Sequence, residues 1–340
     1  MKTSGFLGKL IYWVNIVAAF LLLLSYVLPY IPPKTFSIAP LLSLAVSPLL
    51  FINVVFAVYW IAHLKRRALL SVIVLVIGYF TFGAFYQFAN ESDNTNDLAH
   101  KLKVLSYNVR LFNLYEEESD HNESSFIANL LKEQQPDIVC IQEFYGGSNI
   151  DFAAYPYQFK HFKEDHKLGH AIFSKYPLVE TGAFDFEDTY NNSLFTDVLV
   201  DKDTVRLYNI HLQSLGILPS VDYLQQKNKT RIRRQMSVNF VKQQEQVTAI
   251  LEHKKKTGHP VIIAGDMNNT AFSYVYKKLS KGMNDAFDMA GGGLGTTFSF
   301  DGYPMRIDYV MTSLNIKAIE FGIGADTFSD HYPIWATIGW

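Results

Sequence analysis

The feature that most constrains this chain is the one-sided distribution of its acidic residues. Residues 1–90 contain no Asp or Glu and only six Lys or Arg, so all 32 acidic residues and the other 24 basic residues follow. Residues 91–340 therefore carry a formal charge of −8, from 24 basic and 32 acidic side chains. An apolar segment and a charge-rich segment are stable in different solvents. We expect a membrane-embedded part followed by a domain in water.

Three uncharged, mostly apolar runs fill the first part. They extend over Ile11 to Ile31, Phe36 to Ala62 and Ala68 to Ala89. Each is long enough to cross a hydrocarbon layer, which takes about 20 helical residues. The sequence thus predicts a membrane anchor over residues 1–90 with three transmembrane helices. A cleaved signal peptide is the alternative for the first run, but that run ends without a small-residue cleavage site and two more runs follow it.

The basic residues that flank these runs predict the orientation of the anchor. Five Lys or Arg lie before the first run or between the second and third, whereas only Lys34 lies between the first and second. Cytoplasmic loops carry an excess of Lys and Arg. We therefore expect an integral membrane protein with its N-terminus inside and its C-terminal domain on the periplasmic or extracellular side.

The remainder of the chain has the pattern of an α/β domain. Residues 91–100 are polar and without periodicity, which is typical of a linker. Over residues 101–340, short runs rich in β-branched and aromatic side chains alternate with helical segments. Helices are expected at Glu123 to Gln135, at about Arg234 to Lys256 and at Ala271 to Leu279.

Several of the predicted strands end in polar residues that could bind a metal or transfer a proton. Any one of these residues has an ordinary structural explanation, such as capping a turn or facing water, but their convergence in one domain favours a functional site. The residues are Asn108, Glu143, Asn209, His211, Asp266, Asn268 and Asp308, with Asp330 and His331 directly before the last predicted strand.

These residues lie in six short motifs, which are, in chain order, "SYNVR", "IQE", "NIHLQS", "AGDMN", "RIDYV" and "SDHYPI". In type, order and spacing they resemble the endonuclease/exonuclease/phosphatase superfamily, over roughly Lys101 to Trp340. The resemblance implies a DNase I-like four-layer α/β/β/α sandwich with its site at one edge of two packed sheets. It also implies hydrolysis of a phosphate ester with Mg²⁺ or Mn²⁺ as the cofactor.

The resemblance and the chemistry of oxygen ligands indicate the metal site. Glu143 is the first expected ligand, assisted by Asn108 and by Asp330. Carboxylate and amide oxygens suit Mg²⁺, which keeps several waters and needs only one or two carboxylates from the protein.

The same matches assign the catalytic roles. His331 is the expected general base, with Asp308 holding its tautomer and favouring the imidazolium that forms. Asp266 would orient or deprotonate the attacking water, and the division of this role between Asp266 and His331 stays open. Asn268 and His211 would donate hydrogen bonds to the phosphoryl oxygens, and His211 could alternatively protonate the leaving group.

Two features fall outside this set. His170, in "LGHAIFSKYP", is either a substrate contact that faces the site or an interface residue. The stretch 227–234 holds five Lys or Arg and is either a solvated face or an arm that steers phosphates toward the site.

Three functions are compatible with this sequence. The first is a membrane-anchored phosphodiesterase that acts on nucleic acid, although a domain charge of −8 disfavours a grip on the phosphate backbone. The second is a phosphodiesterase or phosphatase that acts on a phospholipid headgroup or another phosphate ester, which a membrane tether makes convenient. The third, a catalytically silent binding module, is disfavoured because every expected catalytic position holds a competent residue. No obligate protein partner is indicated.

Overall fold

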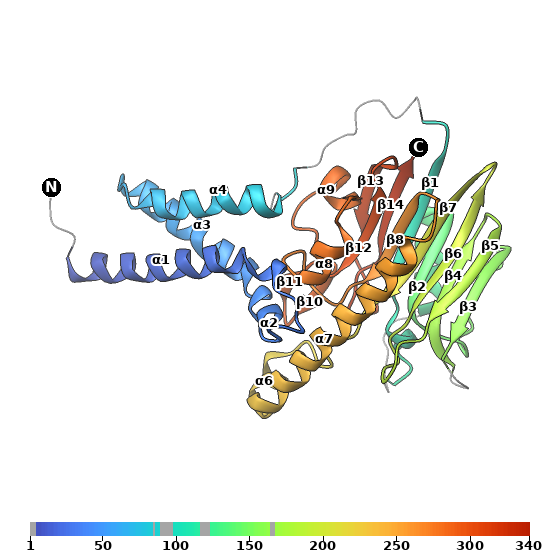
Figure 1. The fold of residues 1–340 in the computed structure, drawn as a ribbon, viewed down its shortest axis with the longest axis horizontal. Helices are drawn as coiled ribbons and strands as arrows, with labels where there is room; N and C mark the ends of the chain where they lie inside the picture. Colours follow the sequence, from blue (N-terminus) through green and yellow to red (C-terminus); the bar gives the residue numbers. More distant parts are fainter. Residues whose placement is uncertain (1–4, 84–85, 89–97, 116–122, 164–166) are drawn as a thin grey trace.

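The computed structural model describes residues 5–83, 86–88, 98–115, 123–163 and 167–340. Helices from the N-terminal part project from one side of a β-sandwich that the rest of the chain forms (Figure 1). Most of the predicted linker, which ends at residue 100, lies outside the described residues.

The N-terminal part consists of three longer helices and two short helical segments. These are α1 (Phe6–Ser25), η1 (Leu28–Tyr30), α2 (Ala39–Ser43), α3 (Val46–Ala62) and α4 (Ala68–Phe82). Within the described residues, the segments Phe6–Tyr30 and Ala39–Ala62 are long and apolar enough to cross a membrane. The third predicted span is shorter than expected. Helix α4 has 15 residues and ends at Phe82, because Gly83 follows with a φ of 83°.

These helices bury polar side chains and expose apolar ones. Asn15 Nδ2 donates a hydrogen bond to Ser71 Oγ (2.6 Å), which in turn donates to Asn53 Oδ1 (3.1 Å), and all three residues are fully buried. The large exposed side chains include Trp13, Phe20, Phe51, Val58, Ile73 and Phe80. This distribution is the inverse of that in a domain surrounded by water.

The C-terminal part contains two six-stranded sheets. The first has the order β13-β14-β1-β2-β4-β3, with strands at Lys317–Ile323, Ile334–Gly339, Lys101–Asn108, Ile138–Tyr145, Leu168–Ser174 and Tyr157–Phe162. The second has the order β5-β6-β7-β8-β12-β9, with strands at Leu178–Phe184, Ser193–Val200, Asp203–His211, Val261–Asp266, Asp308–Ser313 and Met283–Asp285. A separate hairpin joins β10 (Phe298–Phe300) and β11 (Tyr303–Met305).

The two sheets pack face to face and helices cover their outer faces. Side chains such as Val104 and Ile172 from the first sheet meet Leu207 and Ile262 from the second in one buried cluster. Helix α5 (Glu123–Gln134) covers the outer face of the first sheet, whereas α7 (Lys229–Lys254) and α8 (Tyr274–Leu279) cover that of the second. The predicted mixed α/β sandwich is confirmed, with the two sheets packed together between α5 on one side and α7 and α8 on the other.

The topology brings the ends of several strands to one edge. Strands β1 and β2 pair in parallel, as do β7 and β8, so each pair ends on the same side. The antiparallel neighbour β12 starts at that side, with Asp308 opposite Asp266. Antiparallel β14 also starts there, directly after His331. The predicted site residues therefore share one edge of the sandwich.

The basic stretch 227–234 does not form a separate arm. It belongs to the first turns of α7, whose N-cap Asn228 accepts a hydrogen bond from Arg231 N (3.1 Å). Helix α7 therefore begins earlier than the predicted Arg234, because a good N-cap residue precedes the basic run. The short helices α6 (Val221–Gln226) and α9 (Ala286–Ala290) and the 3-10 turn η2 (Arg110–Asn113) complete the described elements.

The helical part contacts the sandwich at several points. Lys34 forms an ion pair with Glu245 on α7, with 3.0 Å between Nζ and Oε1. The rings of Phe82 and Phe272 pack edge to face with their centroids 5.0 Å apart. These contacts place α2 and the start of α3 beside the β10–β11 hairpin (Figure 1).

Candidate active site

Asp266 occupies the centre of the polar cluster at this edge. Its carboxylate is fully buried and accepts hydrogen bonds from Asn108 Nδ2 (3.1 Å), Asn268 N (2.6 Å) and Asn268 Nδ2 (3.0 Å). The Nε2 atoms of His331 and His211 each lie 3.6 Å from its Oδ2. Five of the predicted catalytic and metal-binding residues are thus mutual neighbours.

The backbone next to Asp266 is fixed by a glycine. Gly265 has a φ of 137°, and a Cβ atom at this position would lie 2.0 Å from the carbonyl oxygen of Ile210. No other residue type allows β7 and β8 to approach this closely. The glycine in "AGDMN" therefore places the carboxylate of Asp266 beside His211 at the end of the neighbouring strand.

His331 and Asp308 form a buried pair. His331 Nδ1 lies 2.9 Å from Asp308 Oδ2 and 3.2 Å from Oδ1, so the aspartate fixes the ring with Nε2 directed toward Asp266. Phe298 of the β10–β11 hairpin packs on the imidazole, with ring centroids 4.9 Å apart. The predicted partnership of His331 with Asp308 has the geometry of a histidine whose tautomer is set by a carboxylate.

Burial and mutual attraction perturb the protonation of this cluster. Burial raises the pKa of Asp266 to about 8, although the nearby His331 acts in the opposite direction. Burial alone would lower the pKa of His331, but the carboxylates of Asp308 and Asp266 outweigh it and raise the pKa to about 10. Both pKa values therefore lie above their usual ranges, and perturbed values of this kind are typical of acids and bases at functional sites.

Glu143 reaches the cluster from an irregular end of β2. The pairing of β2 with β4 shifts register between Ile141 and Phe144, and Glu143 lies in this bulge with a φ of 52°. Its Oε1 accepts a hydrogen bond from Asn108 Nδ2 (3.3 Å) and lies 3.6 Å from His211 Nε2. Burial raises its pKa, although 32% of its side-chain surface still faces the cavity in front of it.

Two sets of side chains could hold a divalent cation. Glu143 and Asp330 line the same cavity and offer the carboxylate oxygens that Mg²⁺ or Mn²⁺ prefers. Asn108 lines it too, but its Nδ2 faces Glu143 and Asp266 while its Oδ1 accepts from Arg110 N (3.1 Å), so it would have to turn its amide to offer an oxygen to a cation beside Glu143. Among the described residues, the ligand atoms of Asp266, Asp308 and His331 also lie within 4.8 Å of one another. In this second set the Asp308 carboxylate and His331 Nδ1 already bind each other, so the first set is the better fit.

His170 contacts the site through His211. Its Nε2 lies 3.0 Å from His211 Nδ1, and burial lowers the pKa of His170 to about 3 and that of His211 well below its usual value, so both rings are neutral. The His170 ring is also next to the side chain of Asn192. The hydrogen bond between the two rings links the tautomer of His211 to that of His170, and His211 Nε2 faces Asp266 and Glu143.

Two buried asparagines complete the surroundings, and their roles were not predicted. Asn209 Nδ2 donates to the carbonyl oxygens of Ile141 and Ala171 (both 3.0 Å), and its Oδ1 accepts from Gln142 Nε2 (2.7 Å), so it ties the two sheets together. Asn191 Nδ2 lies 2.8 Å from His211 Nε2. The sequence signal for Asn209 is its position at a strand end, whereas Asn191 lies in an ordinary loop pattern.

Comparison with protein families identifies two regions of the chain. Residues 105–331 match the endonuclease/exonuclease/phosphatase family, and residues 8–85 match a domain of unknown function, DUF8431. No match was found among curated proteins.

Solved structures of the same fold cover the sandwich. An endonuclease/exonuclease/phosphatase from Beutenbergia cavernae is 18% identical with a TM-score of 0.53, over 70% of this chain and 71% of that one. TDP2 from D. rerio, complexed with single strand DNA product, is 18% identical with a TM-score of 0.53, over 71% of this chain and 99% of that one. A functionally unknown conserved protein from Enterococcus faecalis has a TM-score of 0.54 at 18% identity, over 70% of this chain and 100% of that one. At these identities the likeness shows the fold, and the family match covers most of the chain. The chain belongs to the endonuclease/exonuclease/phosphatase family.

Proposed function

We propose that this protein is a membrane-anchored, metal-dependent phosphoesterase that hydrolyses a phosphate ester by in-line attack of water. The observation that carries the proposal is the position of the Asp266 carboxylate, 3.6 Å from both His331 and His211, beside the Asp308–His331 pair. Such a cluster can take a proton from water and donate hydrogen bonds to a phosphoryl group at the same place.

Each residue has a definable part in this reaction. Asp266 or His331, whichever is deprotonated when the substrate is bound, accepts the proton that the attacking water loses, and Asp308 stabilises the imidazolium form of His331. Asn268 and His211 donate hydrogen bonds to the phosphoryl oxygens as negative charge accumulates there. A divalent cation held by Glu143, with Asn108 and Asp330, would withdraw charge from a non-bridging oxygen.

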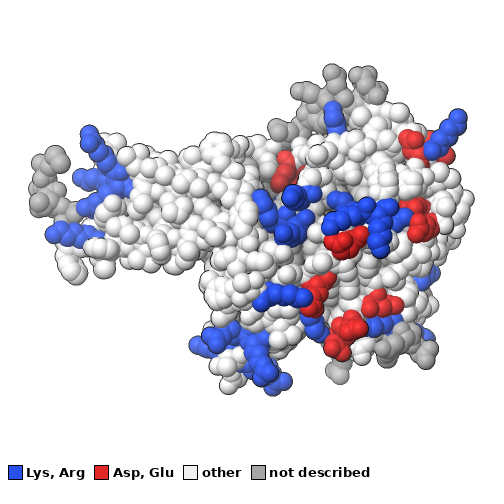
Figure 2. Space-filling model, viewed as in Figure 1, with Lys and Arg blue, Asp and Glu red and all other residues white. Residues whose placement is uncertain are grey.

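The membrane anchor is supported by more than the length of the helices. Two segments are long enough to span a bilayer, and α1, α3 and α4 expose many large apolar side chains while they bury the Asn15–Ser71–Asn53 network beside a small apolar cluster that includes Leu22. Transmembrane bundles have this arrangement, because hydrocarbon rather than water surrounds them. Figure 2 shows Lys and Arg at the free tip of the bundle and, past an uncharged band, again over the sandwich. Together with the basic flanks, this supports a cytoplasmic tip and an extracytoplasmic sandwich.

A silent binding module remains the least supported alternative, because the predicted catalytic residues are both present and adjacent. The decisive test uses the intact chain in detergent micelles with bis(p-nitrophenyl) phosphate. We expect release of p-nitrophenol in Mg²⁺ or Mn²⁺, loss of release in chelator, and loss in His331→Ala. The matched control is His259→Ala, because His259 is exposed and lies outside the site. Equal rates for the two alanine variants would contradict the proposal.

The side of the membrane has its own test. A reporter fused after Trp340 that works only outside the cytoplasm should be active. Activity of a reporter that requires the cytoplasm would refute the predicted orientation.

A further inference from the structure

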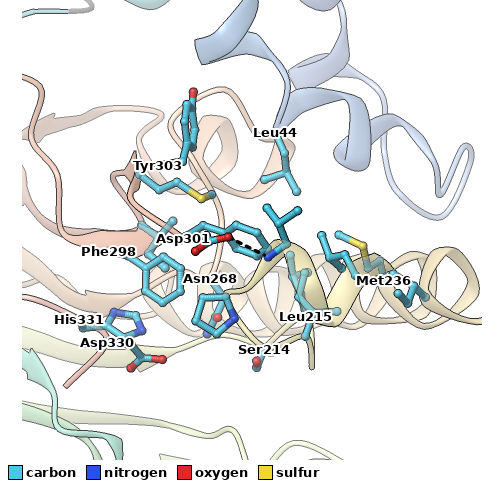
Figure 3. Close-up of a pocket in the computed structure, with 18 of the residues that line it drawn as sticks. Leu44, Ser214, Leu215, Met236, Asn268, Phe298, Asp301, Tyr303, Asp330 and His331 are labelled. Carbon is cyan, nitrogen blue, oxygen red and sulfur yellow. Dashed lines mark hydrogen bonds between the residues drawn. The ribbon is translucent and has the colours of Figure 1, made fainter. Parts of the chain in front are cut away.

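One cavity connects the catalytic residues with the membrane anchor. It has a volume of about 830 Å³, within the range that buries small organic ligands. At one end it is lined by Glu143, Asp266 and His331, and at the other by Leu41 and Leu44 from the beginning of the second membrane segment. In Figure 3, Leu44 points into the cavity from the anchor helices, away from the end where His331 and Asp330 lie.

The wall between these two ends is apolar. Three different elements contribute it. Helix α7 supplies Ile232 and Met236, the β10–β11 hairpin supplies Phe298 and Phe300, and the loop before α6 supplies Ile217. A hydrogen bond from Val221 N to Asp301 Oδ2 (3.2 Å) links the start of α6 to the β10–β11 hairpin (Figure 3). The side chains of these five wall residues offer no hydrogen-bonding group, whereas Lys229, Arg233 and Asp301 line the cavity around them.

The rim of the cavity has two properties that indicate an amphiphilic ligand. Leu218 and Val221, in the loop and helix at its mouth, are exposed apolar side chains. Lys229 and Arg233, one turn apart on α7, also line the cavity and are exposed, and Figure 2 shows Lys and Arg gathered where α6 and α7 begin. An apolar rim with cations matches the boundary between hydrocarbon and anionic headgroups.

We propose that the substrate is an amphiphile: an anionic phosphate ester of a long hydrocarbon chain, with its phosphorus at Asp266 and His331 and its chain along the apolar wall toward Leu44. This inference rests on the proposed function and assigns its substrate class. A polynucleotide is a poorer occupant, because its charged backbone and polar sugars would lie against a wall that offers them few hydrogen bonds.

The reaction is a balanced hydrolysis. The water oxygen forms a new bond to phosphorus, the bond from phosphorus to the leaving alcohol oxygen breaks, and the proton that water loses ends on that alcohol. No oxidant, reductant or co-substrate other than water is needed. The basic stretch of α7 acquires a role in this scheme, because Lys229 and Arg233 would attract the anionic headgroup to the mouth of the cavity.

The test compares ethyl p-nitrophenyl phosphate with hexadecyl p-nitrophenyl phosphate, using the full-length protein in mixed micelles of constant composition with Mg²⁺ or Mn²⁺. We expect kcat/KM to be at least about tenfold higher for the hexadecyl ester, because burial of even a few methylenes contributes that much. Ile232→Asp should lower the ratio of hexadecyl to ethyl activity by about tenfold through the same effect. Ile232→Trp should move the preference toward shorter chains, because the indole fills part of the cavity. Val238→Asp, an exposed position on the same helix that does not line the cavity, should keep the wild-type ratio.

Each contrary result has a distinct meaning. Equal kcat/KM for the two esters in the wild-type protein would overturn the inference, as would a single-stranded oligonucleotide that is hydrolysed with higher kcat/KM than the hexadecyl ester. An unchanged chain-length preference in both Ile232 variants would also overturn it. In these three cases the proposed phosphoesterase function would stand. No release of p-nitrophenol from either ester would instead refute the proposed function itself.

Discussion

The N-terminal helices and the β-sandwich differ in which side chains they bury and which they expose. In the sandwich, Leu207 and Ile262 are buried between the sheets and charged side chains face outward, whereas in the helices Asn15 and Asn53 are buried and large apolar side chains face outward. The proposed membrane anchor accounts for this difference, because hydrocarbon rather than water would then surround the exposed apolar side chains. Under that proposal the two parts of the chain suit two different solvents, and the cavity lies where the two parts meet.

Buried polar groups also differ in kind between the two parts. The helices bury neutral amides and hydroxyls that satisfy each other, and no Asp or Glu occurs there. The sandwich buries Asp266, Asp308 and His331 together at one edge. Buried charge is expensive, and elsewhere in the sandwich the buried Asp197 and Asp285 are each paired with an arginine. Two carboxylates that share one histidine are instead the arrangement expected of the proposed site.

The largest expected effect is on catalysis, from Asp266→Asn. We expect kcat to fall by roughly 10³-fold, because the amide cannot accept a proton from water while it keeps the shape of the site. Burial raises the pKa of Asp266 to about 8, so at pH 7 folding protonates this carboxyl, and the variant should unfold at the same or a higher denaturant concentration. Rates are compared above pH 8, where the wild-type carboxylate can accept a proton. Rates are measured with bis(p-nitrophenyl) phosphate, with the exposed Asp151→Asn as the control. A wild-type rate in Asp266→Asn would place the chemistry elsewhere.

The second-largest expected effect compares the outer surface of the N-terminal helices with that of the β-sandwich. Phe51 on α3 and Val179 on β5 are exposed to similar extents, 64% and 67%. Phe51→Asp should disfavour membrane insertion by about 3 kcal/mol, because Phe51 lies near the middle of the segment Ala39–Ala62. Val179→Asp should change stability by no more than about 0.5 kcal/mol. The measurement is the fraction of chain that resists carbonate extraction from membranes, and equal fractions for both variants would argue against the anchor.

A smaller effect tests a polar tie inside the sandwich. Asn209→Leu keeps the volume but removes three hydrogen bonds, including that from Gln142, and leaves their partners buried. We expect the free energy of unfolding to fall by about 2 kcal/mol, which is typical of a buried group that loses its partner. Urea denaturation of the detergent-solubilised protein measures it. An unchanged midpoint would mean that water replaces the lost contacts.

The sequence was sufficient for much of this structure, for physical reasons. The charge partition predicted an apolar and a charge-rich part, and the strand ends predicted that their polar residues would lie together, because the topology of a sandwich brings parallel strand ends to a common edge. The roles assigned to these residues stay predictions. The true end of α4 was missed, since Gly83 sits within an apolar run whose hydropathy continues beyond it. The start of α7 was also missed, because four basic residues in the first turns after Asn228 obscured the helical pattern of apolar positions.

Side-chain contacts across distant segments could not be predicted at all. His170 lies on β4 and His211 on β7, in different sheets, and their contact depends on how the sheets face each other. The tie formed by Asn209 depends on the same packing. The apolar cavity is a still longer-range feature, because Leu44, Ile232 and Phe298 come from three separate segments.

His170 provides the next prediction. His170→Phe should lower kcat about tenfold with little change in KM, because His211 would lose the hydrogen bond that fixes its tautomer. His170→Gln should restore most of the rate, since an amide N–H can donate to His211 Nδ1. A purely structural role for His170 would lower stability in both variants and would not separate kcat from KM.

The smallest expected effect compares buried hydrogen bonds in the N-terminal helices with those in the β-sandwich. Asn15→Leu removes the bonds from Asn15 Nδ2 to Ser71 Oγ and from Trp60 Nε1 to Asn15 Oδ1 (3.0 Å). In a bilayer such bonds contribute only about 0.6 kcal/mol each, because the separated helices find other partners for these groups. Asn15→Leu should therefore destabilise the bundle much less than Asn209→Leu destabilises the sandwich, when both are measured by thermal unfolding in one detergent. Equal losses of stability in the two variants would mean that the interior of the bundle behaves like the interior of a domain in water. That result would contradict the proposed difference in solvent between the two parts.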